Sequence, residues 1–248
     1  MRDIEMIHGI MKQADDTRWH GYDALRALMM ILGVFFHACY SYSVNFPGYV
    51  NDPGSSKAFD ATLLILHAFR MPTFFAMAGF FTCLVIGKKG PENWLRDRTR
   101  RILLPFLVCY VFFTPLMTLL TGRLSDHASP GDLVAAVADM FVGKSQLYHF
   151  WFLYFLFSYS LIWYIFRKYA PQALLDADAH LSRSVQRHAG SPARLVLAGT
   201  LISFALMMNE RSGFISYSPF LIPKIRVFVY FLFFFYAGTL MFRARNAL

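Results

Sequence analysis

Six stretches of the chain are apolar enough, and nearly long enough, to cross the ~30 Å hydrocarbon core of a bilayer as helices. They cover residues 25–44, 59–86, 102–120, 150–166, 195–208 and 227–242, and the fifth is the shortest. Polar or basic segments separate them, and the sequence shows no internal repeat. The pattern predicts an all-α fold, a polytopic membrane helix bundle with about six transmembrane helices.

Two connections are longer than turns. Residues 132–141 place their apolar side chains on one helical stripe, which predicts a short amphipathic helix on the outer surface. Residues 171–192 place Leu174, Leu181 and Val185 among charged residues. This second segment predicts another interfacial helix, on the cytoplasmic side.

Composition agrees with a membrane protein. Of the 248 residues, 56% are hydrophobic and only 16% are charged, whereas soluble domains carry ~25% charged residues. The net charge of +9 could indicate nucleic-acid binding. However, the basic residues lie beside the apolar runs and therefore report topology, so no nucleic-acid partner is predicted. The three cysteines lie inside apolar runs without metal-ligand spacing, so no metal is predicted either.

Lysine and arginine counts predict the orientation. From the N-terminal segment through the five connections to the tail, the counts are 4, 1, 6, 2, 5, 3 and 2. Because cytoplasmic loops carry the excess of basic residues, both termini are predicted to be cytoplasmic. No signal-peptide cleavage pattern accompanies the first span, which is therefore expected to be retained. The expected organisation is a cytoplasmic segment at 1–17 and a transmembrane domain at 18–248.

The first span carries an arginine at its start and a histidine eleven residues later. Eleven steps of ~100° bring Arg26 and His37 onto one helix face, ~16 Å apart along the axis. Gly33 and Tyr40 share that face. Ionisable groups at bilayer depth are costly and commonly functional. The pair therefore predicts a polar path into the membrane; the alternative is a hydrogen-bonded packing histidine.

The second span carries Arg70 at a depth similar to that of His37. His67 lies three positions earlier on the same face, and Pro72 is expected to kink the helix. An arginine at this depth requires a carboxylate, carbonyl oxygens or an anion as its partner. A structural pair between two helices is the alternative to a functional role.

A basic loop at residues 96–101 precedes the third span. Arg98 and Arg101 share one face if the third helix begins early. Guanidinium groups suit phosphate oxygens. The alternative is a basic anchor that only sets topology.

Four motifs follow one another in the order found in the membrane-bound acyltransferase-3 family. They are Arg26 with His37, then Phe69-Arg70-Met71-Pro72, then Arg98 with Arg101, and finally His149-Phe150-Trp151-Phe152-Leu153. The sequence resembles that family over residues 18–166 and, within it, the glucan biosynthesis protein C branch. The resemblance implies about ten helices, so the family's later helices are expected to be missing.

The resemblance also implies an activity. Proteins of this kind move an acyl group, such as succinyl or acetyl, from cytoplasmic acyl-CoA to a hydroxyl of an extracytoplasmic glucan or other carbohydrate. The expected location is the bacterial inner membrane, and acyl-CoA is the expected co-substrate. A transporter or flippase and an inactive, truncated relative are the alternatives.

The expected residue roles follow from that activity. At the cytoplasmic mouth, the CoA phosphates would be bound by Arg26, Arg98 and Arg101. His37 would be the general base, and Arg70 would stabilise the oxyanion or an acyl carboxylate. Acceptor-side or structural roles are expected for His67, His149, Trp151 and Tyr40. No Ser or Cys nucleophile beside a base is evident, which favours direct transfer, with a covalent histidine intermediate as the alternative.

Overall fold

The computed structural model describes residues 20–46, 52–124, 131, 134, 138, 147, 150–188, 190–208 and 223–245. In these ranges the regular elements are all helical, which confirms the predicted all-α class for this part of the chain. The first half contains α2 (His20–Cys39), the 3₁₀ turn η1 (Tyr40–Tyr42), α3 (Lys57–Lys89), α4 (Pro91–Arg98), the π turn η2 (Thr99–Leu103) and α5 (Leu104–Leu124). The second half contains α7 (Trp151–Tyr169), α8 (Gln172–His188), α9 (Pro192–Met207) and α10 (Ile225–Ala244).

The basic stretch at residues 96–101 is helical and not the predicted loop. Gly90 ends α3 with a φ of 77°, and Pro91 opens α4 at the position where proline suits a helix. From there the chain continues through α4 and η2 into α5. Hydropathy marks only the apolar part of this helix, so the predicted start at residue 102 is eleven residues too late.

Four of the predicted spans coincide with helices that are long and apolar enough to cross a membrane: Asp23–Tyr42, Lys57–Lys89, Pro91–Met117 and Ile225–Ala244. The chain is therefore a multi-pass membrane protein. The other two predicted spans are also helical, as α7 and α9. However, the 16 residues of α9 cover only ~24 Å. The total of six spans and the cytoplasmic termini stay predictions.

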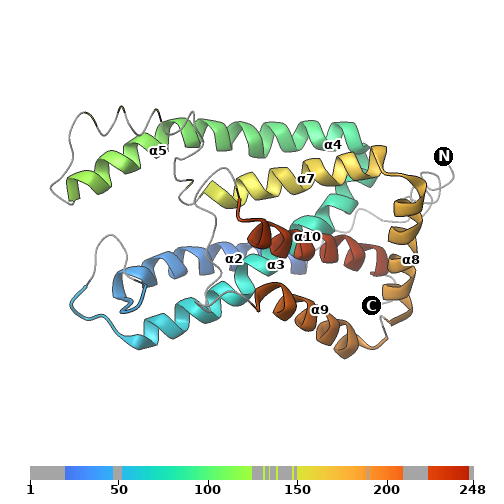
Figure 1. The fold of residues 1–248 in the computed structure, drawn as a ribbon, viewed down its shortest axis with the longest axis horizontal. Helices are drawn as coiled ribbons and strands as arrows, with labels where there is room; N and C mark the ends of the chain where they lie inside the picture. The colour runs from blue at the N-terminus through green and yellow to red at the C-terminus, as the bar shows by residue number, and fades with distance from the viewer. Residues whose placement is uncertain are drawn as a thin grey trace.

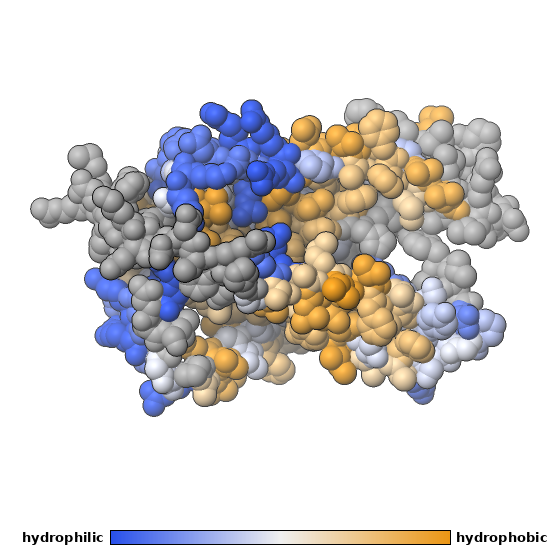
Figure 2. Space-filling model, turned by 180° about the vertical axis from the view of Figure 1, so that it is seen from behind, coloured by the Kyte–Doolittle hydropathy of each residue, from blue (hydrophilic) through white to orange (hydrophobic). Residues whose placement is uncertain are grey.

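Consecutive long helices alternate in direction, and α8 runs across their ends (Figure 1). The space-filling view shows hydrophilic residues gathered at the end of the molecule where α8 lies, with an apolar band beside them (Figure 2). The predicted interfacial helix at 171–192 is thus observed as a helix, α8. Most of the other predicted amphipathic helix, at 132–141, lies outside the described residues.

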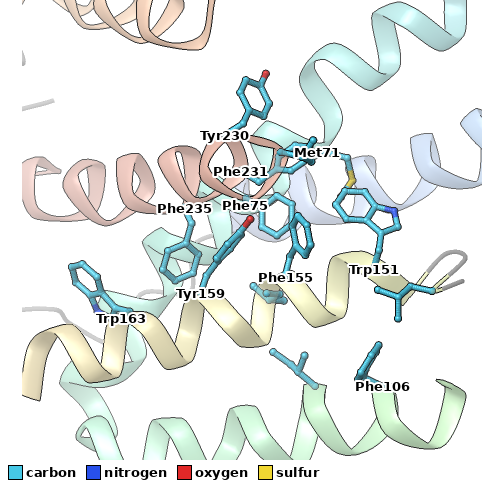
Figure 3. Close-up of a cluster of buried hydrophobic side chains, with 14 of the residues drawn as sticks. Met71, Phe75, Phe106, Trp151, Phe155, Tyr159, Trp163, Tyr230, Phe231 and Phe235 are labelled. Atoms are coloured by element: carbon cyan, nitrogen blue, oxygen red, sulfur yellow. The ribbon is translucent and has the colours of Figure 1, made fainter. Parts of the chain in front are cut away.

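An aromatic core forms where α3, α7 and α10 meet (Figure 3). Phe75 packs against Phe231 and Tyr159 at centroid distances of 5.0 and 5.3 Å, within the range of favourable aromatic pairs. The buried Tyr159 hydroxyl donates a hydrogen bond to the carbonyl oxygen of Phe228 at 2.8 Å. The core therefore contains no unsatisfied polar group at this tyrosine.

Two glycines bring α3 and α10 into backbone contact. A Cβ added to Gly79 would lie 1.8 Å from the Phe235 carbonyl oxygen. A Cβ added to Gly238 would lie 1.8 Å from the Ala76 carbonyl oxygen. Small residues allow such close crossings between membrane helices. This crossing belongs to the most extensive helix–helix contact among the described elements.

A buried carboxylate fixes α2 relative to α3. Asp60, in the first turn of α3, accepts hydrogen bonds from the Ser43 hydroxyl at 2.5 Å and the Val44 amide at 3.0 Å. Asn45 adds bonds from its backbone and its side-chain amide at 3.2 and 2.7 Å. The segment that follows η1 is thereby held on the start of α3.

Candidate functional site

Phe36 on α2 brings four of the predicted site residues together. Its ring stacks on that of His67 from α3 at a centroid distance of 5.6 Å. Edge-on contacts join it to His37 and Tyr40 at 5.2 and 5.3 Å. The guanidinium carbon of Arg70 lies 4.9 Å from the Phe36 centroid, in cation–π range. We call these five residues the Phe36 cluster.

Arg70 lies between the two helices and has no carboxylate partner among the described residues. A Cβ on Gly33 would stand 3.0 Å from an Arg70 terminal nitrogen, so the glycine leaves room for the guanidinium. Arg70 Nε is buried and has no hydrogen-bond partner among the described residues. The contact between Arg70 and the Phe36 ring is an interhelical pair of the kind considered as the structural alternative. The guanidinium also retains donors that suit an anion.

Most of the α2 face that carries Arg26 and His37 is exposed, but Gly33 on that face is buried beside the Arg70 guanidinium of α3. The buried residues of α2 are Met29, Gly33, Phe36 and Cys39, whereas the side chains of Arg26 and His37 are exposed. Periodicity correctly groups the two polar residues, but α3 packs against the neighbouring apolar stripe. No opposite wall of a channel is present among the described residues.

Arg26, Arg98 and Arg101 lie in one electrostatic neighbourhood. Arg26 from α2 and Arg101 from η2 both repel the partly buried Arg98, whereas Asp97 attracts it. The Asp97 carboxylate is already bound by Lys89 at 2.7 Å. We call the three arginines the arginine cluster; it retains positive charge that suits phosphate oxygens.

Trp94 supports the arginine cluster and was not predicted; its position four residues before Arg98 is the signal that could have identified it. The Arg98 guanidinium carbon lies 5.7 Å from the centroid of the Trp94 ring. Trp94 is 1% exposed, and its Nε1–H has no hydrogen-bond partner among the described residues. The arginine cluster thus rests on a buried ring with an unused donor.

The other two predicted residues have different positions. Trp151 is buried in the aromatic core, 5.5 Å from Phe231 and 5.3 Å from Phe155 between ring centroids (Figure 3). His149 lies outside the described residues. Among described residues, no group of three His, Cys, Asp or Glu side chains is arranged to hold a metal ion.

An apolar groove of about 400 Å³ runs along α3 between α2 and α10. Its lining includes Leu25, Phe69, Pro72 and Phe234. None of the predicted site residues lines it, but Leu25 and Phe69 are the chain neighbours of Arg26 and Arg70. The groove therefore lies beside both polar clusters without containing either.

A buried ion-pair network links α8 to α7 and α10, and sequence reasoning missed it. Asp178 accepts hydrogen bonds from Arg243 at 2.8 and 3.0 Å and from the Tyr236 hydroxyl at 2.6 Å. Arg167 approaches the same carboxylate at 3.4 Å. The sequence signal that could have indicated the network is the position of Asp178 on the same helix face as Leu174 and Leu181.

The network determines the ionisation of Asp178. Burial raises the pKa of the carboxyl, but the hydrogen bonds and positive charge of Arg243, the Tyr236 hydrogen bond and the charge of Arg167 outweigh burial. The pKa of Asp178 therefore lies below its ordinary value. The ionised carboxylate joins three helices at the polar end of the molecule.

Comparison with known sequences identifies the family. A family profile described as an acyltransferase domain matches residues 19–248. The chain belongs to the acyltransferase-3 family. The profile match confirms the predicted family. Together with its long apolar helices, it identifies the chain as a multi-pass membrane protein of an acyltransferase family.

The chain is similar to the glucans biosynthesis protein C of Salmonella typhi and to that of Salmonella typhimurium. The chain is 30% identical to each over 109 residues. These alignments cover 44% of this chain and 27% of each relative, so the match spans about a quarter of the relatives' length. No solved structure matches the chain.

Proposed function

We propose that this protein transfers an acyl group from cytoplasmic acyl-CoA to a hydroxyl of an extracytoplasmic carbohydrate. Family membership supports the reaction class. The name of the Salmonella relatives supports a glucan as the acceptor. A succinyl or acetyl group is the proposed cargo, and the proposed location is the bacterial inner membrane.

The arginine cluster is the observation that carries the donor proposal. Two helices contribute three guanidinium groups to one neighbourhood, where the nearby Asp97 is already paired with Lys89. Like charges held together are costly unless an anion compensates them. The phosphates of CoA supply such anions, and guanidinium groups bind them through paired hydrogen bonds.

The Phe36 cluster is the proposed place of the chemistry. It lies ~16 Å from Arg26 along α2, measured by helical rise to His37. His37 takes the proton of the acceptor hydroxyl while the hydroxyl oxygen attacks the thioester carbonyl carbon. The carbon–sulfur bond then breaks, and the CoA thiolate receives the proton from His37. A positioned base of this kind contributes ~10²–10⁴-fold in rate.

Arg70 is the proposed anion binder within that cluster. Its Nε lacks a partner among the described residues, and Gly33 leaves space at its terminal nitrogen. The guanidinium would stabilise the negative oxygen that forms when the hydroxyl attacks, or the free carboxylate of a dicarboxylic acyl group. Transfer from both acetyl-CoA and succinyl-CoA should separate these two roles. Arg70→Lys should impair both donors if it binds the oxyanion, and mainly succinyl-CoA if it binds the carboxylate.

The test of the base uses membranes that contain the protein, radiolabelled acyl-CoA and a glucan acceptor. His37→Ala should reduce transfer by at least 10²-fold. His180→Ala is the matched control, because His180 is exposed on α8. Full transfer by the His37 variant would reject the assignment.

The donor site is tested separately through substrate dependence. Arg98→Ala combined with Arg101→Ala should raise the KM for acyl-CoA with a smaller change in kcat. Arg183→Ala combined with Arg187→Ala removes two exposed basic residues from α8 and should leave the KM unchanged. An unchanged KM in the first variant would reject phosphate binding by the arginine cluster.

A further inference from the structure

A second groove lies at the polar end of the molecule, apart from both clusters assigned to acyl transfer. It has a volume of about 490 Å³ and is formed by α7, α8 and α10. Its inner wall includes Tyr159, Trp163 and Phe235, whose rings lie between α7 and α10 in Figure 3. The size is within the ~300–1,000 Å³ of ligand pockets. An apolar chain is the chemistry that this lining fits.

The position of α8 places the groove at the membrane surface. Leu174 and Leu181 line the groove and are 53% and 43% exposed. Arg183 and Arg187 lie on the opposite side of the helix and are exposed. Because α8 crosses the ends of the long helices (Figure 1), this division suits a helix with one edge in the acyl region and the other in water.

Positive charge remains at the polar end of the groove. Asp178 lines the groove, and Arg243 binds its carboxylate through two nitrogens. Arg167 makes only a 3.4 Å contact to that carboxylate, and its side chain is 31% exposed. Among the described residues, two guanidinium groups thus share one carboxylate, which leaves one net positive charge.

We propose that this groove binds an anionic phospholipid of the surrounding bilayer. One acyl chain lies along Trp163 between α7 and α10, and the phosphate lies beside Arg167. Basic pockets between membrane helices at the cytoplasmic surface recognise anionic head groups in this way. The lipid would hold α8 against the helix ends in addition to the Asp178 network.

The test measures quenching of Trp163 fluorescence by lipids with brominated chains. The chain has four tryptophans, so the Trp163 contribution is the difference between the wild-type protein and Trp163→Phe. Brominated phosphatidylglycerol and brominated phosphatidylcholine are titrated into otherwise identical detergent micelles. Half-quenching should need about fivefold less phosphatidylglycerol, the ratio given by ~1 kcal/mol for one basic residue near an anionic surface.

Variants separate the head-group contact from the chain contact. Arg167→Gln should reduce the fivefold ratio to about one, whereas Arg167→Lys should retain a preference. Arg187→Gln removes the same charge from the water side of α8 and should change nothing. Ala177→Phe should reduce quenching by both lipids, because Ala177 lines the groove.

Two results would overturn the proposal. Equal quenching by both lipids in the wild-type protein would mean that the groove does not select anionic lipid. Undiminished quenching in Ala177→Phe would mean that the chain lies outside the groove. Thermal unfolding of each variant in the same detergent establishes that it is folded. If Arg167→Gln unfolds, the comparison of the two lipids in the wild-type protein and the Ala177→Phe variant still decide the proposal.

Discussion

Replacing Gly79 with alanine should separate α3 from α10. The new Cβ would lie 1.8 Å from the Phe235 carbonyl oxygen, about 1.6 Å short of the 3.4 Å at which ordinary van der Waals contact begins. The obstacle is helix backbone, which cannot rotate away as a side chain can. The two helices must therefore move apart where their contact is closest.

The cost follows from what the crossing holds together. Separating two packed atoms by 0.5–1 Å already removes a quarter to a half of their dispersion attraction. Phe75 and Phe231, at 5.0 Å between centroids, and Phe80 and Phe242, at 5.1 Å, pack on either side of the crossing. Overpacking typically costs 1–3 kcal/mol. Because backbone is displaced and both aromatic pairs loosen, we expect a loss of about 3 kcal/mol or more in unfolding free energy.

The assay is unfolding in mixed micelles with increasing denaturing detergent, followed by tryptophan fluorescence. Gly199→Ala is the matched control: it also lies inside a helix, but an added Cβ meets nothing within 4 Å. It should be neutral or gain up to about 1 kcal/mol from helix propensity. Equal stability of the Gly79 and Gly199 variants would refute the close crossing.

The reciprocal glycine gives a second check on the same reasoning. Gly238→Ala meets the Ala76 carbonyl oxygen at 1.8 Å and should cost a similar amount. Once one alanine has separated the helices, the second has less to displace. The double variant should therefore cost clearly less than the sum of the single variants. Additive costs would show that the two glycines act at independent contacts.

Three further predictions use other contacts. Gly33→Ala should lower acyl transfer about tenfold by displacing Arg70. Its unfolding free energy should stay within about 1 kcal/mol of wild type, because only a flexible side-chain end must move. Wild-type activity in this variant would contradict the prediction. Asp178→Asn should cost about 3 kcal/mol at pH 7 by leaving Arg243 uncompensated. The pKa of Asp178 in the folded protein lies below its unfolded value of ~4. The ionised carboxylate therefore stabilises the fold above pH ~4, and this stabilisation is lost as the pH falls through the folded pKa. Denaturation curves of the wild-type protein should show this loss, and those of Asp178→Asn should lack it. Asp60→Ala should cost about 2–3 kcal/mol by leaving the donors of Ser43 and Asn45 without their acceptor, and unfolding curves equal to wild type would contradict it.

The hydropathy pattern predicts where helices lie better than where they begin. α10 covers residues 225–244 against a predicted 227–242, because its ends coincide with the change from apolar to basic residues. The helix that contains α5 begins at Pro91, because charged residues continue a helix when no capping residue stops it. Hydropathy does not detect a helix that continues through charged residues, so it predicted a loop at residues 96–101.

Periodicity groups residues on a face but does not say which neighbour that face meets. Arg26 and His37 share a side of α2 as the sequence predicts, yet α2 packs on α3 through Phe36 and Cys39. Phe36 itself was not predicted, because a phenylalanine in an apolar run carries no distinguishing signal. Its role emerges only when the partner helix brings His67 and Arg70 to its ring.

The described carboxylates and guanidinium groups differ in how completely they are satisfied. Asp60 and Asp178 are buried, and each accepts several hydrogen bonds from this chain's own residues. Arg70 and Arg98 are partly buried, yet they rest on aromatic rings and form no salt bridge with a described carboxylate. Asp60 and Asp178 are therefore already paired, and Asp97, which attracts Arg98, is shared with Lys89. Under the proposed function, an anionic substrate would compensate both arginines, with the CoA phosphates at Arg98 and the negative oxygen of the reacting acyl group at Arg70.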